Sequence, residues 1–73
     1  MARKEVRAEI SGTVFSILVK PGDVVAEGDT LALIEAMKME IPVVSPVAGK
    51  IAEVRFTEGE AIAEDALLAV VEI

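Results

Sequence analysis

The centre of the chain reads Thr30-Leu31-Ala32-Leu33-Ile34-Glu35-Ala36-Met37-Lys38-Met39-Glu40-Ile41-Pro42-Val43-Val44-Ser45. Residues 30–36 and 39–45 contain alternating and β-branched apolar residues, a pattern typical of strands. We therefore predict two strands joined at Met37-Lys38 by a tight hairpin turn. A two-residue type I′ turn needs positive φ at both central residues and usually contains Asn-Gly or a similar pair. Met-Lys is a poor choice for such a turn, which suggests that function selected the pair.

The pattern of turn residues and apolar residues occurs twice in the chain. A shift of 37 positions pairs glycines with glycines and apolar residues with apolar residues: Gly12 with Gly49, Gly22 with Gly59, Leu31 with Leu68, and, as a charged match, Glu35 with Glu72. This coincidence indicates an internal duplication of a folding unit. Shifting Lys38 back by 37 positions reaches residue 1, and shifting it forward passes Ile73. We therefore expect a pseudo-two-fold axis that places Lys38 and the two chain ends at opposite ends of the molecule.

Short segments with apolar residues at every second position indicate half-buried strands throughout the chain. These positions are Val6, Ala8 and Ile10; Ile17 and Val19; Leu31 and Leu33; Ile41 and Val43; Val54 and Phe56; Leu68 and Val70. Turn residues separate the segments, among them Ser11-Gly12, Ala48-Gly49 and Pro21-Gly22, the last of which suits the centre of a type II turn. No segment has convincing helical periodicity. We predict an all-β fold in which two copies of about four strands stack face to face as a flattened barrel or sandwich of two four-stranded antiparallel sheets.

Composition excludes several classes of function. The 73 residues predict one domain, 1–73, that is too small for a deep catalytic cleft. The chain has no cysteine and no histidine, which removes disulfides, thiolate metal sites and the commonest general base, so we do not expect an independent enzyme. Thirteen acidic and seven basic residues give a net charge of −6, which opposes binding to nucleic acid. The charged amino terminus does not resemble a signal peptide or membrane helix, so we expect a cytoplasmic protein without membrane insertion.

Acidic residues near the turns raise the question of a metal site. Asp23, Glu27 and Asp29 have a spacing that metal ligands can show, but the adjacent turns explain them better, and we predict no metal site. Asp65 occupies the position equivalent to Gly28 in the first copy. Aspartate tolerates the left-handed region better than most residues, so we expect mild strain at Asp65 and an intact turn.

The hairpin and its surroundings resemble a known family. Ala36-Met37-Lys38-Met39 follows a Gly-Asp-x-Leu-x-x-Ile-Glu run from Gly28 to Glu35, and Ser45-Pro46 and Gly49 follow it. This arrangement resembles the biotinyl domain of biotin carboxyl carrier proteins, within the biotin/lipoyl attachment domain family, whose fold is a barrel-sandwich hybrid. The segment from Phe15 to Gly22 has no inserted loop, so the chain is similar to members that lack the protruding thumb.

The resemblance implies a carrier function. Lys38 would bind biotin covalently through an amide at its side-chain nitrogen. The bound biotin would accept a carboxyl group at a biotin carboxylase and deliver it at a carboxyltransferase. Because a lysine amine is almost entirely protonated at pH 7, attachment needs an enzyme that activates the biotin carboxylate, and a biotin protein ligase is the implied partner.

Residues around Lys38 each have a plainer interpretation. A lone lysine on a turn is usually an ordinary solvent-facing side chain. Met37 and Met39 could fill gaps in the core, and Met39 shares its alternation with Ile41; the resemblance instead makes both part of the biotinyl motif. The resemblance also leaves a set of residues that could shape ligase recognition, although the charged ones could be ordinary solvated groups: Glu35, Ala36 and Glu40.

Three functions remain open on the sequence. The leading hypothesis is a biotin carrier of a carboxylase or decarboxylase. The second is a lipoyl carrier serving a 2-oxoacid dehydrogenase or glycine cleavage, a family whose lysine usually lies in Asp-Lys-Ala. The third is an unmodified sandwich module that holds an assembly together.

Overall fold

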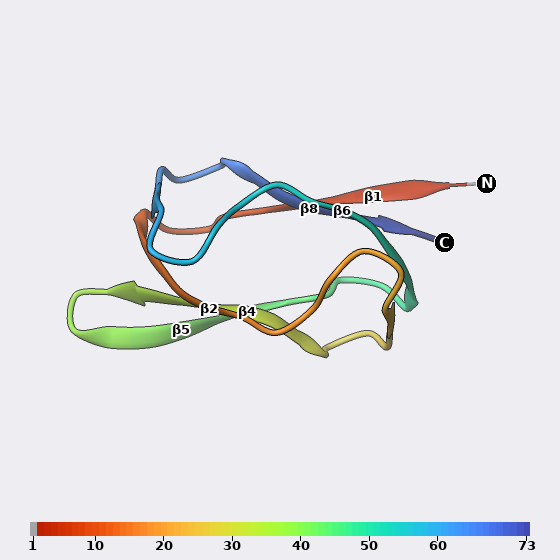
Figure 1. Ribbon diagram of the computed structural model, residues 1–73, viewed down its shortest axis with the longest axis horizontal. Helices are drawn as coiled ribbons and strands as arrows, with labels where there is room; N and C mark the ends of the chain where they lie inside the picture. Colours follow the sequence, from red (N-terminus) through yellow and green to blue (C-terminus); the bar gives the residue numbers. More distant parts are fainter. Residues whose placement is uncertain (1) are drawn as a thin grey trace.

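A computed structural model describes residues 2–73 and contains eight strands in that range. Their bounds are β1 (Arg3–Arg7), β2 (Gly12–Ile17), β3 (Val24–Val25), β4 (Thr30–Ala36), β5 (Met39–Val44), β6 (Gly49–Val54), β7 (Ala61–Ile62) and β8 (Leu67–Glu72). Sheet A has the order β1-β8-β6-β3 and sheet B the order β5-β4-β2-β7, with all pairs antiparallel. The sheets pack face to face in an elongated molecule of 37 × 17 × 17 Å (Figure 1). The predicted all-β sandwich of two four-stranded antiparallel sheets is confirmed.

The duplication in the sequence is also present in the topology. A shift of 37 positions converts β2 into β6 and β3 into β7, and it brings β1 onto β5 and β4 onto β8 to within one residue. The same shift converts the strand order of sheet A into that of sheet B. Our expectation that each copy forms one layer is wrong, because β1 and β3 of the first copy pair with β8 and β6 of the second. Each sheet therefore takes two strands from each copy.

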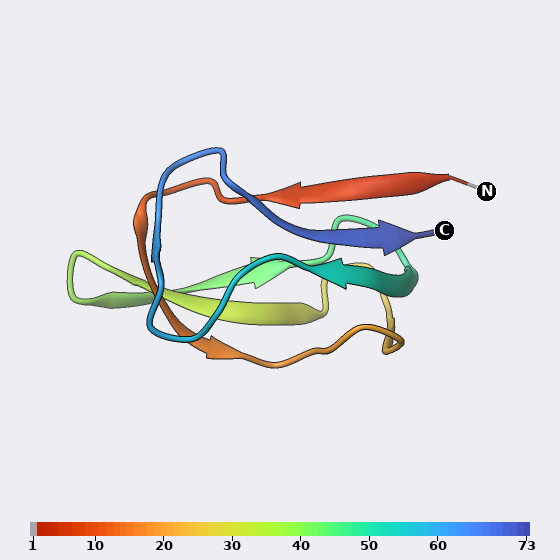
Figure 2. The same ribbon diagram turned by 45° about the horizontal axis from the view of Figure 1, so that its top comes forward.

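Two clusters of buried apolar side chains fill the space between the sheets. Figure 2 shows the arrangement of the two sheets from a second angle. One is formed by Ala8, Val14, Ala32, Ile34, Phe56, Ile62 and Leu68, and the other by Val6, Val25, Leu31, Ile51, Ala69 and Val71. Val43 and Val54 are half-buried and pack against both clusters, which joins them into one core. Symmetry-related residues make equivalent contributions: Val14 and Ile51 are each 1% exposed.

The alternation in β4 is interrupted by a bulge. The register with β5 shifts between Thr30 and Ala32, so Leu31 and Ala32 are both buried. From Ala32 onward the inward positions include Ile34, and Leu33 is half-buried on the outward side of sheet B. The prediction that Leu31 and Leu33 share one face is therefore wrong, because a bulge reverses the alternation of the residues that follow it.

Four type II turns connect the strands, in two symmetry-related pairs. At the predicted Pro21-Gly22 turn, the Asp23 amide donates to the carbonyl oxygen of Lys20 at 3.1 Å, and Gly22 has φ of 98°. Gly28 and Gly59 occupy the same position in two further turns, with φ of 88° and 86°. Asp65 takes this position in the fourth turn with φ of 73°, as predicted.

Carboxylates at these turns accept hydrogen bonds from the backbone. The oxygens and their donors are Asp23 Oδ2 with the Lys20 amide at 3.0 Å, Asp29 Oδ2 with the Ala26 amide at 2.9 Å, and Glu60 Oε1 with the Thr57 amide at 2.9 Å. Each bond closes a turn and accounts for the acidic residue there. No cluster of three or more metal-ligating side chains occurs in residues 2–73.

Gly12 and Gly49 do not act as turn residues, in contrast to our expectation. They begin β2 and β6 and do not have positive φ. A Cβ atom on Gly12 would lie 2.5 Å from the Glu35 carbonyl oxygen and 2.8 Å from Cγ2 of Ile34. Glycine is required here because β2 passes very close to the base of the hairpin that contains Lys38. The same range, 2–73, contains no helix of the length and apolar character needed to cross a membrane.

Replacing Gly22 with valine should destabilise the domain by about 1 to 3 kcal/mol, because a β-branched residue is strained at positive φ. No neighbouring atom lies within 4 Å of a Cβ at this position, so the effect reports backbone strain and not a clash. Urea denaturation measures the change in the free energy of unfolding. Gly22→Asn is the matched control and should cost less, because asparagine tolerates positive φ. Equal stability of Gly22→Val and the natural protein would contradict the assignment of this turn.

Candidate functional site

The hairpin between β4 and β5 ends in a two-residue turn. Ala36 and Met39 form its last cross-strand pair, and Met37 and Lys38 have φ of 52° and 63°. The predicted type I′ turn with positive φ at both central residues is therefore confirmed. Left-handed backbone costs about 1 to 2 kcal/mol for a residue other than glycine. The fold holds this pair in a conformation that the backbone of neither residue favours.

The tip is exposed and apolar. Met37 is 81% exposed and Met39 62% exposed, so neither fills a gap in the core. Met39 does share a face with Ile41, but the hairpin extends beyond the neighbouring loops at this end (Figures 1 and 2). Lys38 is exposed, and among residues 2–73 no hydrogen bond or ion pair involves its side chain. Its primary amine is consequently accessible to a second protein from several directions.

Glu35 and Glu40 lie directly opposite each other on the outward side of sheet B. Facing carboxylates in a cross-strand pair repel each other and are destabilising. The symmetry-related pair in sheet A is Arg3 with Glu72, and there the side chains form an ion pair with 3.6 Å between Nη2 and Oε2. The fold thus accepts opposite charges at this position, and the two carboxylates beside Lys38 are not required for folding.

Ala36 holds the base of the tip against β2. It is 7% exposed, and a Cβ on Gly12 would lie 3.2 Å from its methyl group. Its side chain therefore faces the interior, and any effect of Ala36 on ligase recognition would act through the shape of the hairpin. Sequence reasoning missed this supporting role of Gly12. The signal that could have found it is the pairing of Gly12 with Gly49 at the start of two strongly alternating segments.

The chain ends occupy the place where symmetry would put a second hairpin. The Ile73 amide donates to the Ala2 carbonyl oxygen at 2.8 Å, next to the Arg3–Glu72 pair. Figure 1 shows both ends of the chain at the opposite end of the sandwich from the β4–β5 turn, as predicted. The molecule therefore has one closed tip, and Lys38 is on it.

A groove lies between edge strands β1 and β5, away from the tip. It has a volume of about 270 Å³, and its lining includes Lys4, Glu9, Ile34, Ile41, Val43 and Pro46. No residue of the tip from Met37 to Met39 lines it. The groove therefore does not form a cleft around Lys38, and the chemistry available at the tip is that of a single exposed amine.

Comparisons with known proteins agree with this geometry. The model of the Biotin_lipoyl family, described as "Biotin-requiring enzyme", matches residues 4–71. The biotinylated protein TB7.3 homolog of Mycobacterium leprae is 44% identical over 68 residues, which cover 93% of this chain and 96% of that protein. The biotin/lipoyl attachment protein of Bacillus subtilis is 36% identical over 63 residues, covering 86% of each chain.

A solved structure has the same fold within a much larger protein. Kluyveromyces lactis urea carboxylase superposes with a TM-score of 0.92 and 28% sequence identity over 99% of this chain. The chain spans only 6% of that carboxylase. Sheet architecture and an exposed lysine on the hairpin tip define a small attachment domain. The chain belongs to the biotin/lipoyl attachment family.

Replacing Met37-Lys38 with Asn-Gly should stabilise the domain by about 1 to 3 kcal/mol, because these residues accept the positive φ of a type I′ turn. The free energy of unfolding from urea titration measures the gain. The control replaces Ala63-Glu64 with Asn-Gly. These two residues directly precede Asp65 and do not themselves have positive φ, so this replacement should not increase the free energy of unfolding. An Asn-Gly tip no more stable than the natural one would show that the tip is unstrained.

Proposed function

We propose that this chain is a biotin carrier domain with its attachment point at Lys38, and that residues 1–73 function as one domain. The observation that supports this most directly is the geometry of the tip: an exposed lysine amine, held at positive φ between two exposed methionines on the projecting end. Family membership and the biotinylated relative support the choice of biotin as the covalent group. Neither the core nor the turns need methionine or lysine at these positions.

The attachment step is an acylation of the lysine amine. Nζ of Lys38 loses a proton and forms an amide bond with the carboxyl carbon of biotin, while the activating group on that carboxylate departs. A free carboxylate does not form an amide with an amine unaided, so the step needs a biotin protein ligase that activates biotin and positions the amine. We also propose that the chain functions in the cytoplasm, where ATP is available to activate biotin.

The attached biotin supplies the carboxyl-transfer chemistry, and the protein supplies position. We propose that a biotin carboxylase and a carboxyltransferase are the partners, which the likeness to a domain of urea carboxylase supports. The chain itself would be non-catalytic, since the groove between β1 and β5 does not reach Lys38 and the tip is open to solvent. Tethering raises the concentration of biotin at each partner without any new contact.

A lipoyl carrier is the alternative function, and one relative leaves it open. The name of the Bacillus subtilis relative, biotin/lipoyl attachment protein, includes both groups. A hairpin lysine suits either acyl group chemically. Met37 and Met39 replace the aspartate and alanine usual around a lipoyl lysine, and this favours biotin.

Incubation with a biotin protein ligase, biotin and ATP should add one biotinyl group to the chain, and Lys38→Arg should abolish the addition. Intact mass spectrometry measures the change, and peptide mapping locates it. Lys20→Arg and Lys50→Arg are the matched controls and should be modified at the natural rate, because both lysines lie away from the tip. Biotin on Lys20 or Lys50, or a lipoyl group on a chain produced with both ligases, would contradict the proposal.

The position of the chain ends gives an independent test. A tag fused to Met1 or Ile73 should leave the rate of biotinylation within about twofold of the untagged rate, because the outer ends of β1 and β8 lie across the 37 Å length of the molecule from Lys38. The same tag inserted between Glu40 and Ile41 should block biotinylation. Circular dichroism checks that each fusion is folded. Slow biotinylation of a folded, terminally tagged chain would mean that the termini obstruct the ligase.

A further inference from the structure

The outward side of sheet B has a row of exposed apolar side chains. Ala32, Ile34 and Ala36 point into the core, so the residues between them point outward, and direct cross-strand pairing places Pro42 opposite Leu33. The outward apolar residues are Phe15, Leu18, Leu33, Pro42 and Val44, and we call this set the apolar face. Phe15 and Leu18 are each 53% exposed and Val44 is 45% exposed.

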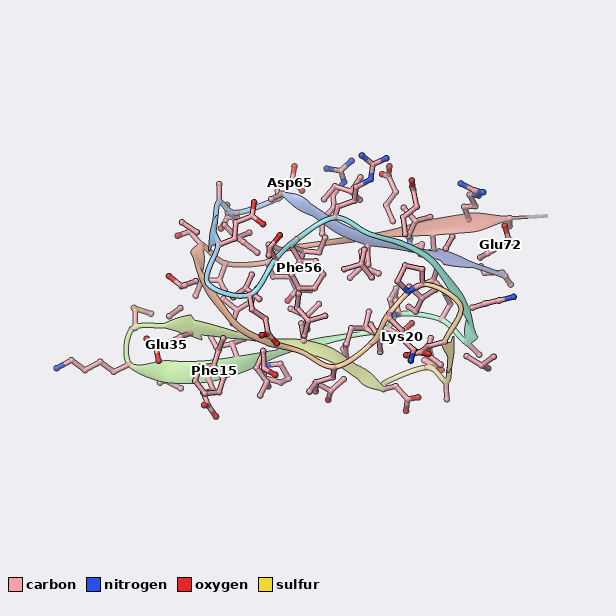
Figure 3. All side chains as sticks on the ribbon, viewed as in Figure 1. Phe15, Lys20, Glu35, Phe56, Asp65 and Glu72 are labelled. Carbon is pink, nitrogen blue, oxygen red and sulfur yellow. The ribbon has the colours of Figure 1, made fainter. Side chains whose placement is uncertain are left out.

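Phe15 belongs to this face because of a bulge. The register between β2 and β4 shifts between Val14 and Ser16, so Phe15 and Ser16 together oppose Leu33. Val14 remains in the core, and Phe15 is left on the outside of the sheet. Figure 3 shows Phe15 and Glu35 on the sheet that ends in the hairpin.

The internal symmetry provides a control for these positions within the same molecule. The residues of sheet A equivalent to the apolar face, 37 positions away, are Ala52, Arg55, Val70, Glu5 and Arg7. Three of these five are charged, so the fold accepts charged side chains at positions 18, 42 and 44. The apolar character of sheet B on this side is therefore not a requirement of folding.

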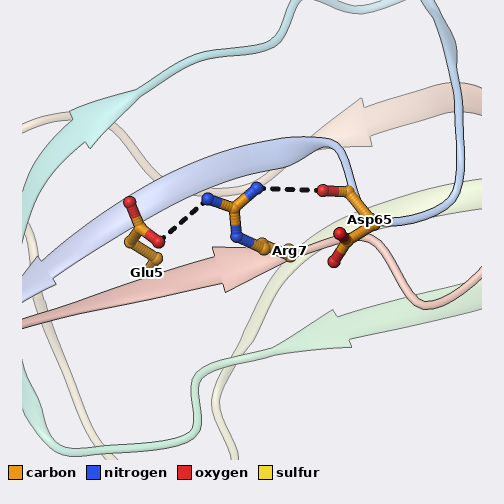
Figure 4. Close-up of polar contacts among 3 residues, drawn as sticks. All are labelled: Glu5, Arg7 and Asp65. Carbon is orange, nitrogen blue, oxygen red and sulfur yellow. Dashed lines mark hydrogen bonds and ion pairs between the residues drawn. The ribbon is translucent and has the colours of Figure 1, made fainter.

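Ion pairing separates the two outward faces further. The three ion pairs among residues 2–73 are Arg3–Glu72, Arg7–Glu5 and Arg55–Glu53, and all lie on sheet A. Figure 4 shows Arg7 between Glu5 and Asp65. Its guanidinium donates to the Glu5 carboxylate at 2.9 Å and to the Asp65 backbone carbonyl oxygen at 3.0 Å. Within the strands of sheet A, Val24 is the lone large apolar side chain that is exposed.

The charged side chains within the strands of sheet B are all acidic. Strands β2, β4, β5 and β7 contain no lysine or arginine, whereas Glu35 and Glu40 flank the face at its hairpin end. Glu58 borders β2, where its Oε2 accepts a hydrogen bond from the Ile17 amide at 3.1 Å. A complementary partner would have an apolar centre and basic side chains opposite these carboxylates.

We propose that the apolar face is the docking surface for the biotin carboxylase component, through an apolar surface bordered by basic residues. This inference rests on the proposed attachment of biotin to Lys38. Val44 is roughly 20 Å along the strand from Lys38, at about 3.3 Å per residue. A partner held there leaves the tip free to move, which suits an enzyme that acts on the distal ring of biotin. A ligase must instead hold the backbone around the lysine itself.

The test transfers the residues of sheet A onto sheet B. The variant Phe15→Ala, Leu18→Arg, Pro42→Glu and Val44→Arg gives each position the residue that the fold already accepts at its symmetry mate, and it raises the net charge by one. Val24→Arg raises the net charge by the same amount on sheet A and is the matched control. If the fourfold variant does not fold by circular dichroism, Phe15→Ala with Leu18→Arg replaces it.

Two enzyme assays measure the effect of these variants. With biotin protein ligase, biotin and ATP, both variants should be biotinylated within about twofold of the natural rate. With a biotin carboxylase from the same source as the chain, bicarbonate and ATP, kcat/KM for the biotinylated fourfold variant should fall at least about tenfold, and Val24→Arg should be unaffected. Free biotin is the reference substrate. Its kcat/KM, measured in the presence of each variant, should equal the value measured with no domain present.

Other outcomes overturn the docking proposal. Unchanged carboxylation of the fourfold variant would mean that the apolar face is not used. An equal loss in the ligase assay would make the ligase its occupant. Sedimentation of the natural chain as a dimer, with the fourfold variant monomeric, would assign the face to a second copy. Failure of ligase to modify the natural chain would overturn the proposed function as well, whereas modification at Lys38 with unchanged carboxylation would overturn only the docking surface.

Discussion

Strand pairing between the two copies of the repeat is the interaction on which the whole structure depends. Within the first copy β2 pairs with β4, but β1 and β3 find their partners in β8 and β6 of the second copy. A copy alone would leave strand edges and one side of its apolar residues in water, at a cost that so few residues cannot offset. Folding therefore requires both copies at once. Equivalent residues of the two copies make equivalent contributions to the core clusters.

This shared architecture explains how a strained tip can persist. The pair Met37-Lys38 is held at positive φ because the strands below it are fixed by cross-strand pairs from Ala36–Met39 down to Thr30–Val44. Gly12 adds to this by allowing β2 to approach the carbonyl of Glu35 closely. Lys38, the proposed attachment residue, thus sits on a rigid base, and within residues 2–73 its side chain forms no hydrogen bond or ion pair.

The alternation of apolar residues and the 37-residue repeat were enough to predict the all-β sandwich, the hairpin turn and the separation of Lys38 from the chain ends. They did not predict which strands share a sheet, because a sequence repeat shows that two units are alike but does not show how their edge strands pair. The bulges at Leu31 and Phe15 were not predicted either, because the extra residue breaks the alternation without any residue type that signals a bulge. For the candidate site, the sequence predicted that Lys38 lies on the hairpin turn, but the opposition of Glu35 and Glu40 required the register. The role of Gly12 required knowledge of how closely two backbones approach.

The hydrogen bond between the Ile73 amide and the Ala2 carbonyl has a mechanical consequence. Strands β1 and β8 are antiparallel neighbours with Ala2 and Ile73 side by side at one end, so a pulling force applied at these two residues loads the hydrogen bonds of this ladder one after another, beginning with that one. Such loading separates β1 from sheet A at low force. If the two strands were instead pulled lengthwise past each other, all the hydrogen bonds between them would bear the load at the same time. The hairpin that contains Lys38 lies at the far end, in the other sheet, and bears none of this load until β1 has detached.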